Sequence, residues 1–92
     1  MKVDFYATLR QIVGAKTVEL SLAEGITVQE LIAELIRRYP KLGLALLDED
    51  GELYRHVHVF IDGRDAIYLE HKLETVLTSN NTVDIFPPVA GG

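Results

Sequence analysis

One strongly amphipathic helix is predicted over residues 27–39, and it restricts how this 92-residue chain can fold more than any other feature. Thr27 and Glu30 have the spacing of a capping box, and Pro40 ends the helix. Its apolar side chains recur at helical spacing, at Val28, Leu31, Ile32, Leu35, Ile36 and Tyr39. Because a single helix cannot cover its own apolar stripe, a sheet must pack against it.

Most of the other apolar residues alternate with polar ones, which is typical of half-buried strands. Strands are expected over residues 2–9, 16–22, 56–61 and 82–86, with a short strand over residues 65–68. The first two strands are expected to form a hairpin that turns at Gly14, and Asp62-Gly63 predicts a second hairpin. Residues 42–47 are expected to form a short helical turn, whereas residues 69–77 fit no single pattern.

This element order predicts an α+β fold, with a mixed sheet of about five strands and one main helix across one face. With the first and last strands side by side at the centre, the arrangement is the β-grasp of ubiquitin; that pairing is inferred by analogy. We assign residues 1–87 to this domain and residues 88–92 to a flexible C-terminal tail.

Composition excludes several functions. The chain has no cysteine, which rules out disulfides, thiolate zinc sites, iron–sulfur clusters and cysteine nucleophiles. Nine Lys and Arg against 14 Asp and Glu give a net charge of −5, and no basic cluster suited to nucleic acid is present. The charged amino end argues against a secretion signal, and no apolar run approaches the roughly 20 residues that span a bilayer. We therefore expect a cytoplasmic protein that binds neither nucleic acid nor membrane.

Two groups of possible metal ligands lack the further ligands that a site needs. His56 and His58 lie two apart on an expected strand, but a third ligand such as His71 cannot be placed, so no metal site is expected. The acidic run over residues 48–51 lacks the ligand spacing of an EF-hand loop. No glycine-rich phosphate loop occurs, so we expect no bound cofactor. If the function requires ATP, we expect a partner to bind it.

The C-terminal segment contains the group that we expect to react, the carboxylate of Gly92. Pro87 and Pro88 end the last strand and hold the chain extended. The following side chains shrink to a methyl group and then to hydrogen, along Val89, Ala90, Gly91 and Gly92. Such a segment can thread a channel too narrow for larger side chains and deliver the Gly92 carboxylate to a buried site. Adenylation by an ATP-using partner would give that carboxylate a good leaving group.

Three segments together resemble a known family. They are Lys2-Val3-Asp4-Phe5-Tyr6-Ala7-Thr8-Leu9-Arg10, Val59-Phe60-Ile61-Asp62-Gly63 and Asp84-Ile85-Phe86-Pro87-Pro88-Val89-Ala90-Gly91-Gly92. The chain resembles the small subunit of molybdopterin synthase and its ubiquitin-like sulfur-carrier relatives, the MoaD/ThiS group. The Pro-Pro pair favours the molybdopterin branch over the thiamine branch. The loop over residues 48–54 resembles longer members, which include archaeal ubiquitin-like modifiers.

The resemblance implies a mechanism in which Gly92 is the reactive residue. An E1-like enzyme adenylates its carboxylate with Mg-ATP, and sulfur from a persulfide donor system displaces AMP to leave a thiocarboxylate. Residues 88–91 then insert into the large subunit of molybdopterin synthase, where the sulfur is transferred to a pterin precursor. In this role the chain is a carrier and a non-catalytic subunit, not an enzyme.

A docking surface is also predicted. Tyr6, Phe60 and Phe86 are out of phase with the core-facing residues of their strands, so they are expected on the solvent side of the sheet near the tail. Arg10 is a candidate for pairing with acidic groups of a partner. Three other functions stay open: a protein modifier joined through Gly92, a sulfur carrier for tRNA or thiamine, and a passive interaction module.

Overall fold

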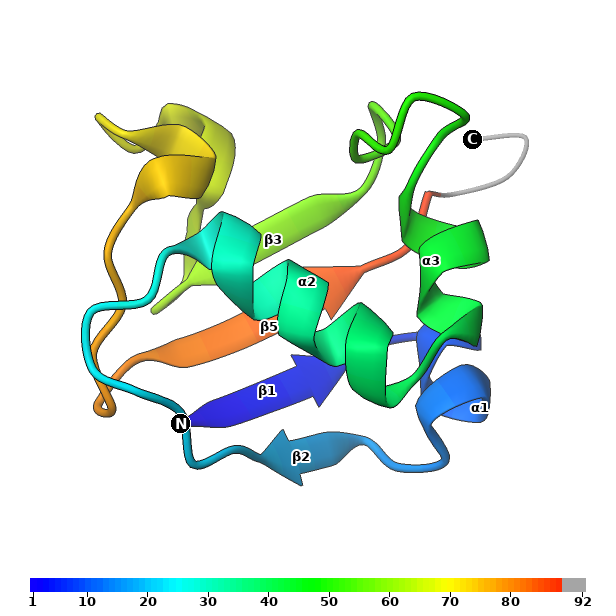
Figure 1. Cartoon of the computed structure of the whole chain (residues 1–92), viewed down its shortest axis with the longest axis horizontal. Helices are drawn as coiled ribbons and strands as arrows, with labels where there is room; N and C mark the ends of the chain where they lie inside the picture. Colours follow the sequence, from blue (N-terminus) through cyan, green and yellow to red (C-terminus); the bar gives the residue numbers. More distant parts are fainter. Residues whose placement is uncertain (89–92) are drawn as a thin grey trace.

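The first and last strands of the described chain lie side by side in the middle of one sheet. The computed structural model describes residues 1–88, and its five strands follow the order β2-β1-β5-β3-β4. β1 runs parallel to β5, and the other neighbours are antiparallel (Figure 1). The bounds are β1 Lys2–Phe5, α1 Thr8–Val13, β2 Thr17–Glu19, α2 Val28–Arg38, α3 Lys41–Leu46, β3 His58–Ile61, β4 Arg64–Asp65, the 3₁₀ helices η1 Ala66–Tyr68 and η2 Lys72–Glu74, and β5 Thr82–Phe86. This is the predicted β-grasp, with its central β1–β5 pair confirmed.

The predicted main helix is α2, which lies across one face of the sheet (Figure 1). Both bonds of the predicted capping box are present, because the Thr27 hydroxyl accepts from the Glu30 amide and the Glu30 carboxylate accepts from the Thr27 amide. The apolar stripe is buried at Val28, Leu31, Ile32 and Leu35. The predicted short helical turn is α3, whose Leu42 and Leu46 are also buried.

The first predicted strand is wrong beyond Phe5. Ala7 has φ +53° and ψ −130°, which no strand residue adopts, and α1 begins at Thr8. Leu9 is fully buried as expected, although a helix and not a strand carries it into the core. The strands on either side still pair antiparallel, but α1 connects them in place of a tight turn at Gly14, which caps α1 with φ +84°.

The second hairpin forms as predicted, with positive φ at Asp62 and Gly63. The short strand after it is only partly correct, since pairing ends at Asp65 and η1 follows. The physical reason is local: one Asp65 carboxylate oxygen accepts from the Ile67 amide, which starts a 3₁₀ turn. The ambiguous residues 69–77 contain η2, which packs against α2.

The predicted domain boundary after residue 87 lies one residue before the end of the described chain and stays a prediction. Pro88 is the last described residue, and the rest of the predicted tail, residues 89–92, lies outside the described residues. Within residues 1–88, no helix combines the length and the apolar character needed to cross a membrane.

Candidate docking face beside the C-terminal segment

The two faces of the sheet differ because side chains alternate along each strand. The helix-covered face is buried, with Val3, Phe5, Val59, Val83 and Ile85 at most 3% exposed. We call the opposite side of the sheet the open face. Tyr6, Phe60 and Phe86 all lie on it, half-buried, as their phase predicted.

These three residues, named here the aromatic patch, contact one another. The Tyr6 and Phe86 rings stack with centroids 4.1 Å apart and planes 14° apart. Phe60 meets Phe86 edge to face at 5.4 Å. The Arg10 guanidinium lies 5.3 Å from the Tyr6 ring centroid, and its Nε donates to the Phe5 carbonyl oxygen at 2.8 Å. The structure therefore brings together all four residues proposed to contact a partner; the contact itself stays a prediction.

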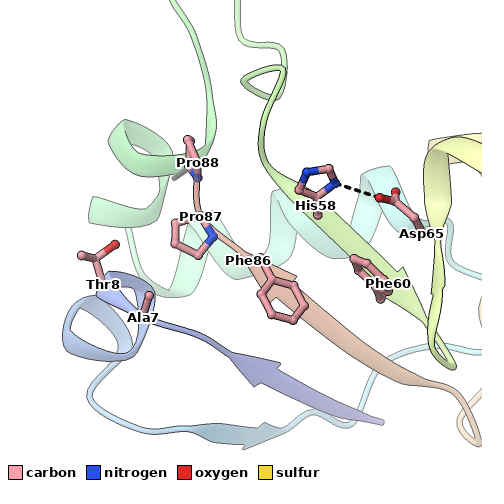
Figure 2. Close-up of a pocket in the computed structure, with 8 residues that line it drawn as sticks. All are labelled: Ala7, Thr8, His58, Phe60, Asp65, Phe86, Pro87 and Pro88. Atoms are coloured by element: carbon pink, nitrogen blue, oxygen red, sulfur yellow. Dashed lines mark hydrogen bonds and ion pairs between the residues drawn. The ribbon is translucent and has the colours of Figure 1, made fainter. Parts of the chain in front are cut away.

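A groove of about 590 Å³ adjoins the aromatic patch where the chain leaves β5. Figure 2 shows its lining, which comes from the end of β5, from β3 and β4, and from the start of α1. The lining residues are Ala7, Thr8, His58, Phe60, Asp65, Phe86, Pro87 and Pro88. Pro88, one of the predicted tail residues, thus lies on the wall of an apolar groove.

Sequence reasoning missed Ala7 and Thr8 at this site. The alternating pattern placed Ala7 inward on a strand, whereas its backbone conformation turns it toward the groove and leaves it exposed. No sequence pattern marks an alanine for positive φ, since glycine is the usual residue there. The groove could therefore not be anticipated from the periodicity of residues 2–9.

The polar pair in the groove is formed by His58 and Asp65. His58 Nδ1 lies 2.8 Å from Asp65 Oδ2, and the Asp65 side chain is only 10% exposed (Figure 2). His56, the other histidine of this possible ligand pair, precedes β3 and does not lie on the strand. Across residues 1–88, no three His, Cys, Asp or Glu side chains are grouped so as to hold a metal ion.

Asp84 is a further residue of this face that sequence reasoning missed. The Tyr6 hydroxyl donates to Asp84 Oδ1 at 3.1 Å. That hydrogen bond, followed by desolvation and the negative charges of Asp84 and Asp4, raises the pKa of the Tyr6 phenol. The available signal was phase, because Asp84 lies two residues before Phe86 on the same strand face.

The remaining site residues, Val89, Ala90, Gly91 and Gly92, lie outside the described residues. Their roles, including that of the Gly92 carboxylate, stay predictions. The described part of the site is thus an apolar surface with a groove from which the predicted tail departs.

Comparison with known proteins places these features in context. Residues 3–92 match the model of the ThiS family. The chain is 36% identical over 92 residues to small archaeal modifier protein 3 of Haloferax volcanii, covering 100% of this chain and 98% of that protein. It is 33% identical over 92 residues to the molybdopterin synthase sulfur carrier subunit of Escherichia coli, covering 100% of this chain and 99% of that subunit.

Two solved structures are similar over nearly the whole chain. The crystal structure of small archaeal modifier protein 1 from Haloferax volcanii has a TM-score of 0.86 and 29% identity, and covers 100% of this chain and 98% of its own. The protein is also similar to a chain in the BexX/CysO complex of Amycolatopsis orientalis, with a TM-score of 0.77 and 30% identity. The match covers 99% of this protein and 98% of that chain. By their printed names, two of these relatives are modifiers, one is a sulfur carrier subunit, and one belongs to a two-protein complex.

Proposed function

The chain belongs to the ThiS family of ubiquitin-like sulfur carriers, and from that premise we propose that it is activated at the Gly92 carboxylate by an E1-like adenylating enzyme. The activated carboxyl end then has one of two uses. It carries a sulfur atom to an acceptor, or it joins the whole chain to a lysine. The relatives carry the names of carriers and modifiers and not of catalysts, which supports a non-catalytic role.

One observation carries this proposal: the aromatic patch and the groove adjoin the point where Pro87 and Pro88 lead toward Gly92. Half-buried aromatic side chains supply the contact area that anchors a partner. A partner docked on this face would contact the domain beside Pro88, from which the sequence continues to Gly92.

The proposed chemistry needs only the terminal carboxylate from this chain. One carboxylate oxygen attacks the α-phosphorus of Mg-ATP held by the partner, and pyrophosphate leaves. A persulfide-derived sulfur, with reducing equivalents from the donor system, then displaces AMP and leaves a thiocarboxylate. In the modifier route, a lysine amine instead attacks the activated carbonyl and an isopeptide bond forms. Both routes begin with the same acyl adenylate.

Among the proposed uses, protein modification ranks ahead of molybdopterin synthesis, which reverses the order expected from the sequence resemblance. The relative named as a modifier is 36% identical over the whole chain. The molybdopterin synthase subunit, at 33% identity over 92 residues, supports the second candidate, in which the large subunit of that enzyme receives the tail. Sulfur transfer to tRNA or thiamine stays a further alternative.

Activation is tested by intact mass measurement. The chain is incubated with the E1-like enzyme from the same genome, Mg-ATP and a sulfur donor. We expect a species heavier by one adenylyl group and, after sulfur transfer, a species in which one oxygen is replaced by sulfur. A variant lacking Gly92 is expected to form neither species while keeping the circular dichroism spectrum of the intact chain.

The same reaction separates the candidate uses. Adding acceptor proteins and searching their lysines for branched peptides tests modification, and adding the large subunit of molybdopterin synthase with its pterin precursor tests sulfur donation. If the cognate enzyme produces neither an adenylate nor a thiocarboxylate, the proposal fails and a passive interaction module is the better description.

A further inference from the structure

A lateral row of side chains crosses the open face beside the aromatic patch. The strand register pairs Asp4 with Thr17 and Asp84, and it pairs Phe60 with Asp84 and Asp65. Residues paired across neighbouring strands lie about 4.8 Å apart and share one face of the sheet. Asp4 and Asp84 are therefore adjacent carboxylates, and Asp84 lies directly next to Phe60.

The carboxylates in this row differ in how many hydrogen-bond contacts they make. Asp65 is engaged by both His58 and the Ile67 amide. Asp4 accepts from the Thr17 hydroxyl at 2.6 Å, and Asp84 accepts from the Tyr6 hydroxyl at 3.1 Å. Both donors are neutral, and among residues 1–88 no ion pair involves either Asp4 or Asp84.

Among the described residues, neither Arg10 nor Lys2 forms an ion pair with these carboxylates. The Arg10 guanidinium lies over the Tyr6 ring, and its Nε bonds the Phe5 carbonyl oxygen. Lys2 precedes Asp4 by two residues on the same strand, without an ion pair to it. The negative charge of the Asp4–Asp84 pair also acts on the phenol of Tyr6 in the aromatic patch, whose pKa it raises in addition to the hydrogen bond.

This pairing costs stability in the isolated chain, because like charges opposite each other in a sheet repel. Each carboxylate keeps free acceptor positions after its single hydrogen bond. A cation placed between them would remove the repulsion and gain charge-assisted hydrogen bonds. The pair is therefore complementary to a positively charged group that sits next to an apolar contact.

We propose that Asp4 and Asp84 determine partner specificity on this face, by binding an arginine or lysine side chain that the E1-like enzyme presents beside the apolar group it seats on the aromatic patch. The identity of the partner rests on the proposed function, whereas its charge follows from this row. An apolar partner surface without that cation would leave the two carboxylates desolvated and unpaired, which disfavours it.

The test compares isosteric neutral variants. Asp4→Asn and Asp84→Asn keep an oxygen that accepts from Thr17 or Tyr6 and remove only the charge. We expect the double variant to bind the cognate E1-like enzyme about tenfold more weakly at low salt, with a flatter dependence of affinity on ionic strength. Its thermal stability is expected to equal or exceed that of the parent chain. Glu74→Gln, which removes one exposed charge on η2, controls for loss of charge outside this row and should bind within about twofold of the parent.

The outcomes separate this inference from the proposed function. Adenylation of the parent chain at Gly92, together with unchanged affinity and salt dependence in the double variant, would overturn the specificity role alone. Absence of adenylation in the parent would overturn the proposed function. A double variant that loses both stability and binding would show Asp4 and Asp84 to be structural, which also contradicts the inference.

Discussion

At the scale of single residues, the backbone of Ala7 decides where β1 ends. Its φ of +53° with ψ −130° lies outside the regions that side chains ordinarily adopt. The turn at Ala7 redirects the chain into α1, so that Leu9 is buried and Ala7 with Thr8 lines the groove. Strain at this one position therefore shapes the wall of the candidate site.

Ala7→Gly is expected to leave the free energy of unfolding unchanged or to raise it by about 1 kcal/mol, because glycine adopts positive φ without strain. Urea denaturation measures the change. The matched control is Ala33→Gly on the exposed side of α2, which is expected to cost about 1 kcal/mol. Equal losses for the two variants would show that the Ala7 backbone is unstrained.

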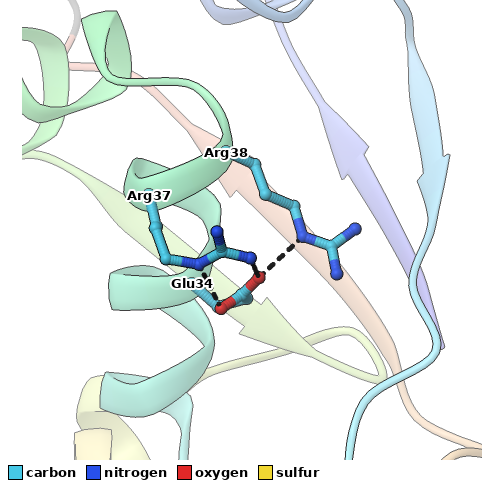
Figure 3. Close-up of polar contacts among 3 residues, drawn as sticks. All are labelled: Glu34, Arg37 and Arg38. Carbon is cyan, nitrogen blue, oxygen red and sulfur yellow. Dashed lines mark hydrogen bonds and ion pairs between the residues drawn. The ribbon is translucent and has the colours of Figure 1, made fainter.

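At the scale of elements, α2 is stabilised at both ends by residues of its own sequence. The capping box satisfies amides at the start. Near the end, Figure 3 shows Glu34 between two arginines, accepting from Arg37 Nη2 at 2.6 Å and from Arg38 Nε at 2.7 Å. The hydrogen bonds from Arg37 and then Arg38 lower the pKa of Glu34 from 4.5 to about 2. The capping box, the apolar spacing and Pro40 are local signals, which explains why this helix was predicted correctly.

The lowered pKa of Glu34 predicts how stability depends on pH. A carboxylate with a depressed pKa in the folded state stabilises fully above its unfolded pKa of 4.5, and the contribution disappears as the pH falls toward about 2. Glu34→Gln lacks this contribution. The stability difference between parent and variant is therefore expected to be greatest above pH 4.5 and to shrink between pH 4.5 and 2. Thermal melts across this range measure it, and a constant difference would contradict the prediction. High salt should reduce the effect, since the pair is on the surface.

At the scale of the whole molecule, the two faces of the central sheet serve different purposes. One face is covered by α2 and forms the core, whereas the open face carries the aromatic patch, the groove and the row of carboxylates. The central strands β1 and β5 come from opposite ends of the described chain. The core and the candidate site are therefore completed only when β5 inserts between β1 and β3.

Neighbouring residues of β5 test this division, because Ile85 faces α2 and Phe86 lies on the open face. Ile85→Ala is expected to cost about 2–5 kcal/mol of stability, since the side chain is fully buried. Phe86→Arg is expected to cost about 1 kcal/mol from lost ring contacts while strongly weakening binding to the E1-like enzyme. Denaturation and binding measurements on both variants test which face of the sheet each side chain occupies. A stability loss for Phe86→Arg as large as that for Ile85→Ala would place Phe86 in the core.

The sequence by itself determined the main helix with its cap, the last strand, the second hairpin, and the phase that puts Tyr6, Phe60 and Phe86 on one face. Each of these depends on the spacing of residues close together in the chain. Only the tertiary structure decided that Ala7 turns the chain into α1 and that Asp4 lies beside Asp84. Strand register joins residues far apart in the chain, and the packing of Leu9 in the core is compatible with either a strand or a helix. Long-range pairing therefore decided that the two carboxylates lie side by side on the candidate docking face, whereas local periodicity had already determined its aromatic character.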